Sequence, residues 1–318
     1  MTLAARLFAV AALAAAAAAP AQDYPSKPIR VIVPYAAGGA DLYIRPLQAS
    51  LAKSLGQPLV IENMGGGGGM VGANVVRTSR PDGYTLCFCG TGALTTAPRL
   101  AASAPYTLEE FAPIANVISI PFMLAMRRDR PYGTFAEFLA FARANPGKIS
   151  YGTPGDGSAP HLAAEAMAAV AGIRLLHVPY QGIVPAVQAA LGGHIDGVMG
   201  APSVIMPQVN DGKLVALAVT SPERFPPMPN VMTQREGGVD SQYVTRFGFF
   251  APRGTPEPVI AKFAAALAES VKDPAYVEQM RRMYNDVVFI APAPYATSLV
   301  AEDQGYAKLI KDLRIKVQ

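Results

Sequence analysis

Two glycine-rich turns in this sequence place hydroxyl and carboxylate side chains where they could help to hold an anion. The first turn lies in 29–45, IRVIVPYAAGGADLYIR, where Gly38 and Gly39 separate an apolar strand-like run from a helix that begins near Asp41. A strand that ends in such a turn leaves main-chain N–H groups and a helix dipole that favour an anion. Asp41 is expected to cap this helix and to shape the anion pocket without touching the ligand.

The second turn, 151–161, reads YGTPGDGSAPH and repeats this design. Ser158 is predicted to be the N-cap of the following helix, with Pro160 in its first turn. Free N–H groups and the hydroxyls of Thr153 and Ser158 could bind a second anionic end. The alternative is an ordinary capped connection between a strand and a helix. Tyr180 follows the next strand on the same rim and could add polar contacts.

The spacing of the serine, histidine and acidic residues gives little indication of a catalytic or metal site. Ser158 and His161 stand three residues apart at a helix start, without a G-x-S-x-G elbow or an evident orienting acid. The three histidines, His161, His177 and His194, lack metal-ligand spacing. Asp196, at a strand start, is as consistent with a structural role as with a functional one. We therefore expect no catalytic residue, no bound metal and no cofactor.

A run of five glycines, 65–69, contains G-x-G-x-x-G as Gly67, Gly69 and Gly72. A nucleotide-binding loop is one interpretation, but five consecutive glycines meet much of that pattern by chance and no G-x-x-x-x-G-K-[ST] occurs. The other interpretation is a close-packed or flexible turn that lines a cleft. The only cysteines, Cys87 and Cys89, share one face of a strand, where a buried reduced pair is expected rather than a strained disulfide.

Composition and the first residues indicate an exported globular protein. Half of the 318 residues are hydrophobic and 16% are charged, with 27 Lys and Arg against 23 Asp and Glu and no basic run. This balance argues against nucleic acid as a partner. Residues 1–21 combine Arg6, an apolar alanine-rich run and an A-x-A site, which predicts a signal peptide cleaved near Ala21 and a periplasmic mature chain.

The elements that must position both turns alternate between strands and helices almost throughout, typical of an α/β protein. Strands are predicted at 29–33, 58–63, 85–90, 121–127, 149–153, 175–179, 195–199, 214–220, 245–251 and 287–290. Helices are predicted at 41–55, directly after the glycine run 65–69, at 134–145, 159–171, 184–191, 256–272 and from 294 onward. We interpret this layout as two lobes, the first formed by 22–119 and 222–318 and the second, 120–221, inserted into it. The two crossings between them would act as a hinge.

A series of motifs in this order resembles one known family. The motifs are YPSKPIRVIVPYAAGGAD, LGQPLVIEN, GGGGGMVGA, PDGYTL, ANPGKISYGTPGDGSAPHLAAE, HVPYQGIVPAVQAALGGHIDGVM, GKLVALAVTS and FGFFAPRGTP. Together they resemble the periplasmic solute-binding receptors of tripartite tricarboxylate transporters, the Bug family, over essentially the whole mature chain. The resemblance implies a two-lobed type II periplasmic binding protein (Venus flytrap), each lobe a mostly parallel sheet flanked by helices. It also implies a small carboxylate as ligand.

The resemblance assigns ligand contacts by position. With the polar residues discussed above, the expected binding residues are Tyr35, Ala37, Gly38, Gly39, Ala40, Asp41, Thr91, Gly92, Thr153, Gly155, Gly157, Ser158, His161, Tyr180 and Asp196. The sequence departs from the family at three places: Gly39-Ala40-Asp41 lacks the usual threonine, Gly200 replaces a common acid, and Ala97 replaces a polar residue. These departures predict a ligand that is larger or less polar than a simple dicarboxylate.

The sequence thus predicts a monomeric, non-enzymatic periplasmic receptor that presents a small organic anion to membrane permease subunits. A sensor kinase as the partner is the alternative. An α/β enzyme and a nucleotide-binding protein are the less favoured interpretations.

Overall fold

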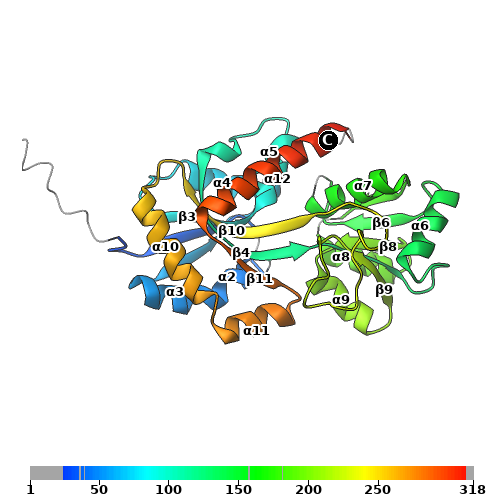
Figure 1. Cartoon of the computed structure of the whole chain (residues 1–318). Coiled ribbons are helices and arrows are strands. Elements are labelled where there is room, and N and C mark those ends of the chain that lie inside the picture. Colours follow the sequence, from blue (N-terminus) through cyan, green and yellow to red (C-terminus); the bar gives the residue numbers. More distant parts are fainter. Residues whose placement is uncertain (1–23, 36, 39, 157, 181, 313–318) are drawn as a thin grey trace, which may run out of the picture.

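The computed structural model describes residues 24–312 except 36, 39, 157 and 181. The predicted signal peptide lies outside the described residues. Two lobes, each built on a mixed sheet covered by helices, lie side by side (Figure 1). No described helix is both long and apolar enough to span a bilayer.

The first lobe contains a six-stranded sheet in the order β11-β4-β10-β3-β1-β2. Its strands are β1 (Ile29–Val33), β2 (Leu59–Asn63), β3 (Thr85–Gly90), β4 (Phe111–Pro121), β10 (Val244–Pro252) and β11 (Asp286–Ile290). The pairs β1–β2 and β1–β3 are parallel, whereas β10 and β11 pair antiparallel. Its helices are α2 (Asp41–Ile44), α3 (Gln48–Leu55), α4 (Met70–Arg77), α5 (Thr96–Leu100), α10 (Glu257–Ser270), α11 (Pro274–Arg282) and α12 (Pro292–Asp312).

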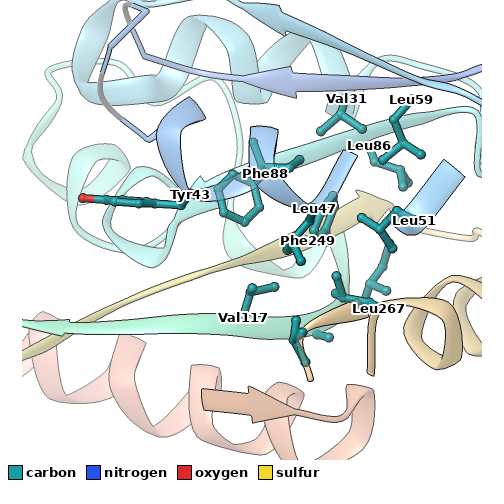
Figure 2. Close-up of a cluster of buried hydrophobic side chains, with 14 of the residues drawn as sticks. Val31, Tyr43, Leu47, Leu51, Leu59, Leu86, Phe88, Val117, Phe249 and Leu267 are labelled. Atoms are coloured by element: carbon teal, nitrogen blue, oxygen red, sulfur yellow. The ribbon is translucent and has the colours of Figure 1, made fainter. Parts of the chain in front are cut away.

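Alternating side chains of this sheet fill two separate cores. On β3, Leu86 and Phe88 pack with α3 and α10, while Cys87 and Cys89 pack on the opposite face with α4 and α12. Figure 2 shows the first of these cores, where Phe88 and Phe249 lie beside apolar residues of α3 and α10. Both cysteines are buried and free, as the period-two pattern predicted.

The second lobe contains a five-stranded sheet in the order β7-β6-β8-β5-β9. Its strands are β5 (Met123–Arg127), β6 (Ser150–Thr153), β7 (Leu176–Pro179), β8 (Gly197–Gly200) and β9 (Leu214–Val219). One face packs against α6 (Phe135–Ala144) and α7 (Ala159–Ala171), and the other against α8 (Ile183–Leu191) and α9 (Pro202–Asn210). The strands β6, β7 and β8 run parallel, whereas β5 is antiparallel to both of its neighbours.

The sheets are therefore mixed, not mostly parallel as expected. A single residue, Phe122, carries the chain from β4 in the first sheet to β5 in the second, and each of these strands pairs antiparallel with both of its neighbours. The long strands β4 and β10 pair antiparallel beside this crossing, and both extend from the first lobe toward the second in Figure 1, with β4 running toward the second lobe and β10 away from it.

A third connection between the lobes comes from α12. It starts on the first lobe with Tyr295, and near its end Tyr306, Leu309 and Ile310 pack against the core of the second lobe. Buried residues between β9 and β10, such as Phe225 and Tyr243, also pack with the second sheet. The lobe limits drawn from the sequence stay a prediction.

Short elements account for most other differences from the predicted layout. The helix expected over 41–55 is divided into α2, a 3₁₀ turn (η1, Arg45–Leu47) and α3, because Pro46 has no N–H to donate. The other 3₁₀ turns are η2 (Gly67–Gly69), η3 (Thr91–Ala93) and η4 (Leu108–Glu110). Strand β4 and helices α5, α9 and α11 had no counterpart in the predicted layout.

Candidate functional site

A cavity of about 720 Å³ lies between the two lobes. The first lobe lines it with residues of the turns after β1, β2 and β3 and of strands β4 and β10. The second lobe contributes the turn between β6 and α7 together with Ile183 and Ala201. The carboxyl ends of β1, β3 and β6 thus open toward one space, as expected for ligand sites in α/β sheets.

Aromatic side chains form much of the first lobe's wall. The ring of Phe247 on β10 lies 5.2 Å from Tyr43 and 6.2 Å from Tyr35, centroid to centroid, and all three line the cavity. Phe122, at the crossing between the lobes, adds a fourth ring. Such rings offer large apolar contact area with defined packing geometry.

The glycine run forms part of the same wall. Gly67 and Gly68 line the cavity, and the run leads directly into α4. At Gly69, whose φ is +99°, an added Cβ would lie 2.8 Å from the Cβ of Ala93. The observation agrees with a close-packed turn that lines a cleft.

The turn after β1 uses its own carboxylate. Asp41 is the first residue of α2 and not its N-cap, which is Ala40. The Asp41 Oδ1 atom accepts a hydrogen bond from the Gly38 N–H at 2.8 Å, and Oδ2 pairs with Arg45 at 2.8 Å. The N-cap prediction is therefore wrong, because the carboxylate turns back into the loop instead of capping from outside the helix. Gly39 lies outside the described residues.

Of the residues expected in this turn, Tyr35 lines the cavity, while Ala37 and Gly38 are exposed and Ala40 is buried in the core. In the next turn Gly92 lines the cavity, and the buried Thr91 donates a hydrogen bond to Glu302 on α12. Glu302 also accepts from Arg246 on β10. Burial raises the pKa of Glu302, although the bonds from Thr91 and Arg246 oppose the shift.

The second lobe presents the start of α7. Ser158 is the N-cap, as predicted, and its Oγ atom accepts from the His161 N–H at 3.4 Å and donates to the Gly155 carbonyl at 2.7 Å. Ser158 and Asp156 both line the cavity. Gly157 lies outside the described residues. This wall therefore carries a hydroxyl, a carboxylate and the N-terminal end of a 13-residue helix.

Two histidines, which are not lining residues themselves, lie beside Asp156 of this wall. The rings of His161 and His177 stack with centroids 3.8 Å apart, and His177 Nδ1 lies 3.3 Å from Asp156 Oδ1. The other nitrogen, Nε2, lies 2.7 Å from Thr153 Oγ1. Burial, together with the neighbouring His161, lowers the pKa of His177 to about 4, and burial also lowers the pKa of His161.

The linear spacing of the histidines did not predict this cluster. The strands β6 and β7 pair in parallel with Tyr151 opposite His177, which brings His177 beside the turn that precedes His161. The third histidine, His194, is exposed and outside the cluster. The parallel register of β6 with β7 was the signal that could have revealed the cluster of Asp156, His161 and His177.

Tyr180 and Asp196, also expected in the site, lie away from the cavity lining, and Thr153, Gly155 and His161 are not lining residues either. The Tyr180 N–H donates to the Thr153 carbonyl at 3.1 Å, and its side chain packs in a core. Asp196 accepts from the N–H and hydroxyl of Ser150, each at 2.8 Å, and pairs with Arg130 at 3.0 Å. Ser150 and Asp196 lie at the amino ends of β6 and β8, whereas Thr153 and the cavity lie at the carboxyl end of β6. These contacts favour a structural role for Asp196.

Several cavity residues were missed by sequence reasoning. Strands and helices provide Tyr43, Thr96, Leu100, Ile120, Ile183, Thr245 and Phe247, and single-residue connections provide Phe122 and Ala201. Among the described residues that line the cavity there is no Lys, Arg or His. The binding role of every expected residue stays a prediction.

Residues 43–315 match the family model described as "Tripartite tricarboxylate transporter family receptor". The chain belongs to this family. Its members are periplasmic binding receptors and not enzymes, which confirms the two-lobed receptor fold predicted from the motifs. The deciding observation is a match that spans both lobes.

Solved structures support the same assignment. The periplasmic binding protein BugD is similar over 93% of this chain and 100% of its own, with 32% identity and a TM-score of 0.79. MatC from Rhodopseudomonas palustris with bound malate gives 30% identity, 91% and 98% coverage, and a TM-score of 0.73. An R. palustris protein with adipate is 26% identical over 92% of this chain and 99% of its own, with a TM-score of 0.82.

The receptor's Thr153, His177 and Asp156 resemble a hydroxyl–imidazole–carboxylate triad in their order of contacts. Thr153 is completely buried, however, so its hydroxyl has no access to a substrate. The contacts among Thr153, His177 and Asp156 therefore hold the turn between β6 and α7 in place.

Proposed function

We propose that this receptor captures a small organic carboxylate between its lobes and presents it to the permease subunits of a tripartite transporter. The observation that carries the proposal is a single cavity lined from both sheets, in a family whose structures include complexes with malate and adipate. A signal peptide cleaved near Ala21 would deliver the chain to the periplasm.

The lining indicates which part of the ligand each wall would contact. Neutral hydroxyl donors would bind the carboxylate, because no described lining residue is basic. The hydroxyls of Ser158 and Thr96 donate to the Gly155 and Gly92 carbonyls in this structure and would turn to the ligand, and Thr245 offers a third hydroxyl. Hydrogen bonds to a charged group contribute about 1.5–3 kcal/mol each. The rings of Tyr35, Tyr43 and Phe247 would cover an apolar body.

We therefore favour a carboxylate with a substantial apolar or aromatic body over a short dicarboxylate. Two further features support this preference. Ala97 lines the cavity where the family often has a polar residue, and Asp156 places a negative charge on the second lobe's wall. In the absence of a cation, that charge would repel a second carboxylate at this position.

A ligand screen tests the proposal. Thermal unfolding of the exported protein would be followed with aliphatic monocarboxylates, dicarboxylates, aromatic acids and nucleotides. We expect the largest stabilisation from acids with an apolar body, and isothermal titration should give one site per chain. Stabilisation by nucleotides alone would contradict the carboxylate proposal and favour the glycine run as a phosphate site.

A further inference from the structure

The second lobe's wall contains a set of side chains that the carboxylate proposal does not use. Asp156, His161 and His177 each offer one ligand atom, and these three atoms all lie within 4.8 Å of one another. They come from the turn after β6, the first turn of α7 and strand β7. Three elements thus converge on one point next to the cavity.

We propose that Asp156, His161 and His177 form a transition-metal site whose open coordination positions face the cavity between the lobes. Two imidazoles and one carboxylate are a donor set that suits Zn²⁺ and similar ions. Mg²⁺ and Ca²⁺ prefer oxygen ligands only, so they fit it poorly. Three protein ligands leave at least one position for water or an exogenous oxygen atom.

The surroundings already orient the first imidazole. Thr153 Oγ1 lies 2.7 Å from His177 Nε2, which leaves Nδ1 as the atom that faces Asp156 Oδ1 at 3.3 Å. Metal-binding histidines usually have their second nitrogen held by such a partner, which fixes the ring. The Thr153 hydroxyl is itself held by Gly155 within the same turn.

The second imidazole has an acidic partner nearby. Glu165 lies one turn further along α7, with Oε1 3.9 Å from His161 Nε2, and the same oxygen accepts a 2.7 Å hydrogen bond from Tyr151. Carboxylate–histidine pairs of this kind raise the basicity of a metal-binding imidazole. Glu165 could therefore act as an outer partner of the site.

Metal binding requires a small rearrangement. Two ligand atoms about 2.1 Å from a tetrahedral ion are roughly 3.4 Å apart, so the widest spacing must shrink. The stacked rings are 10° from parallel, and one of them must turn for both lone pairs to point at a shared ion. Asp156 can follow this movement because its side chain is 53% exposed.

Charge links the site to the cavity. Asp156 is the negative lining residue, and no described lining residue is basic. One carboxylate and two neutral imidazoles leave a divalent cation with a net charge of +1. The ion would change a wall that repels a carboxylate into one that binds it. This inference rests on the proposed function, and it assigns the metal to the carboxylate at the ligand's distal end.

The first experiment uses metal alone. The exported protein, purified without a histidine tag and treated with a chelator, would be titrated with Zn²⁺ by calorimetry, and then with Mg²⁺ and Ca²⁺. We expect one Zn²⁺ per chain and at least tenfold weaker binding of the other two ions. Absence of stoichiometric Zn²⁺ binding, or a preference for Mg²⁺ or Ca²⁺, would overturn the site.

Three variants locate the ion. Asp156→Asn and His161→Gln should each weaken Zn²⁺ binding at least tenfold, since each removes one ligand atom. His194→Gln makes the same chemical change at an exposed histidine outside the cluster and should leave the affinity unchanged. An equal loss in His194→Gln, or unchanged affinity in both cluster variants, would contradict the assignment.

The second experiment adds malate or adipate with and without Zn²⁺. We expect Zn²⁺ to tighten binding of at least one of these dicarboxylates severalfold in the wild type and not in Asp156→Asn. Carboxylate binding by metal-free protein that takes up no Zn²⁺ would leave the proposed function standing and overturn the metal site. Zn²⁺ binding without any effect on carboxylates would overturn the ion's role in ligand binding.

Discussion

Ser158 connects the stability of the second lobe with the proposed ligand site. Its hydroxyl caps α7 and also lines the cavity, so a single oxygen serves the helix terminus and faces the ligand space. Thr134 caps α6 in a capping box with Glu137 and is not among the cavity residues. These two caps allow the contribution of Ser158 to binding to be separated from its contribution to folding.

We expect Ser158→Ala to lower the free energy of unfolding by about 1 kcal/mol, the usual effect of removing a cap. It should also weaken carboxylate binding roughly tenfold, because a hydrogen bond to a charged group is lost. Urea denaturation and calorimetry would measure the two effects. Thr134→Ala should cause a similar loss of stability with unchanged affinity, and an equal loss of affinity in both variants would contradict the role of Ser158.

Glu302 illustrates a buried acid whose interactions cross several elements. It extends from α12 to Thr91 beside the cavity and to Arg246 on β10, and its side chain is only 5% exposed. Burial raises its pKa in the folded protein despite both partners. The folded state therefore retains the proton to a higher pH than the unfolded chain does.

This shift predicts a sign for the pH dependence of stability. The contribution of Glu302 is fully present below the unfolded pKa, near 4.5, and is lost as the pH rises through the raised folded pKa. Glu302→Gln should remove this decrease, so its stability relative to the wild type should improve as the pH rises from 4 to 7. Urea denaturation across this range would measure the difference, and a decline would contradict the prediction.

Glu278→Gln provides a comparison of opposite sign. Hydrogen bonds from Arg281 and Arg282 lower the pKa of Glu278 to about 2 on the exposed face of α11. Any stabilisation from this carboxylate is present above its unfolded pKa and is lost as the pH falls. The two variants should therefore depend on pH in opposite directions.

At the scale of elements, the sequence predicted well those segments whose ends carry strong local signals. Ser158, Pro160 and Gly172 mark both ends of α7, and its observed bounds, Ala159–Ala171, are those predicted. Strand β3 likewise has the predicted bounds. The period-two pattern within 85–90 also assigned its two faces correctly, since both cysteines share one core.

Elements whose limits depend on distant contacts were predicted poorly. Strand β4 was missed because prolines at 113 and 121 interrupt its pattern, although it pairs along its length with β10. Helix α9 contains Pro207, which local rules treat as a helix breaker. The cavity residues of β10 were missed for the same reason, since only pairing with β3 and β4 places Phe247 beside Tyr43.

The close pairing of β10 with β4 leads to a prediction about Gly248. A Cβ added at Gly248 would lie 2.4 Å from the Ala115 carbonyl oxygen, a main-chain atom of β4 that cannot move freely. We expect Gly248→Ala to lower the free energy of unfolding by about 2 kcal/mol, as overpacking in a core commonly does. Thermal or urea unfolding would measure the loss.

Gly305 on α12 is the matched control. An added Cβ there meets nothing within 4 Å, and alanine is the better helix former by about 1 kcal/mol. Gly305→Ala should therefore stabilise the protein slightly. If both substitutions had the same effect on the free energy of unfolding, close packing between β10 and β4 would not explain the role of Gly248.

For the whole molecule, the lobe-to-lobe connections determine how a ligand could act. The chain passes from β4 to β5 through Phe122, returns from the second sheet to β10, and crosses again along α12. Closure around a ligand would move the lobes as rigid bodies about these connections. A ligand drives closure only through its higher affinity for the closed state.

We expect saturating carboxylate to reduce the radius of gyration measured by small-angle X-ray scattering, since both walls of the cavity would contact the ligand. At a concentration of 100 times Kd, the ligand should add about 2.7 kcal/mol to the free energy of unfolding. Ser158→Ala should need a correspondingly higher ligand concentration for the same decrease in radius. Tight binding that left the radius unchanged would indicate that the lobes do not close on the ligand.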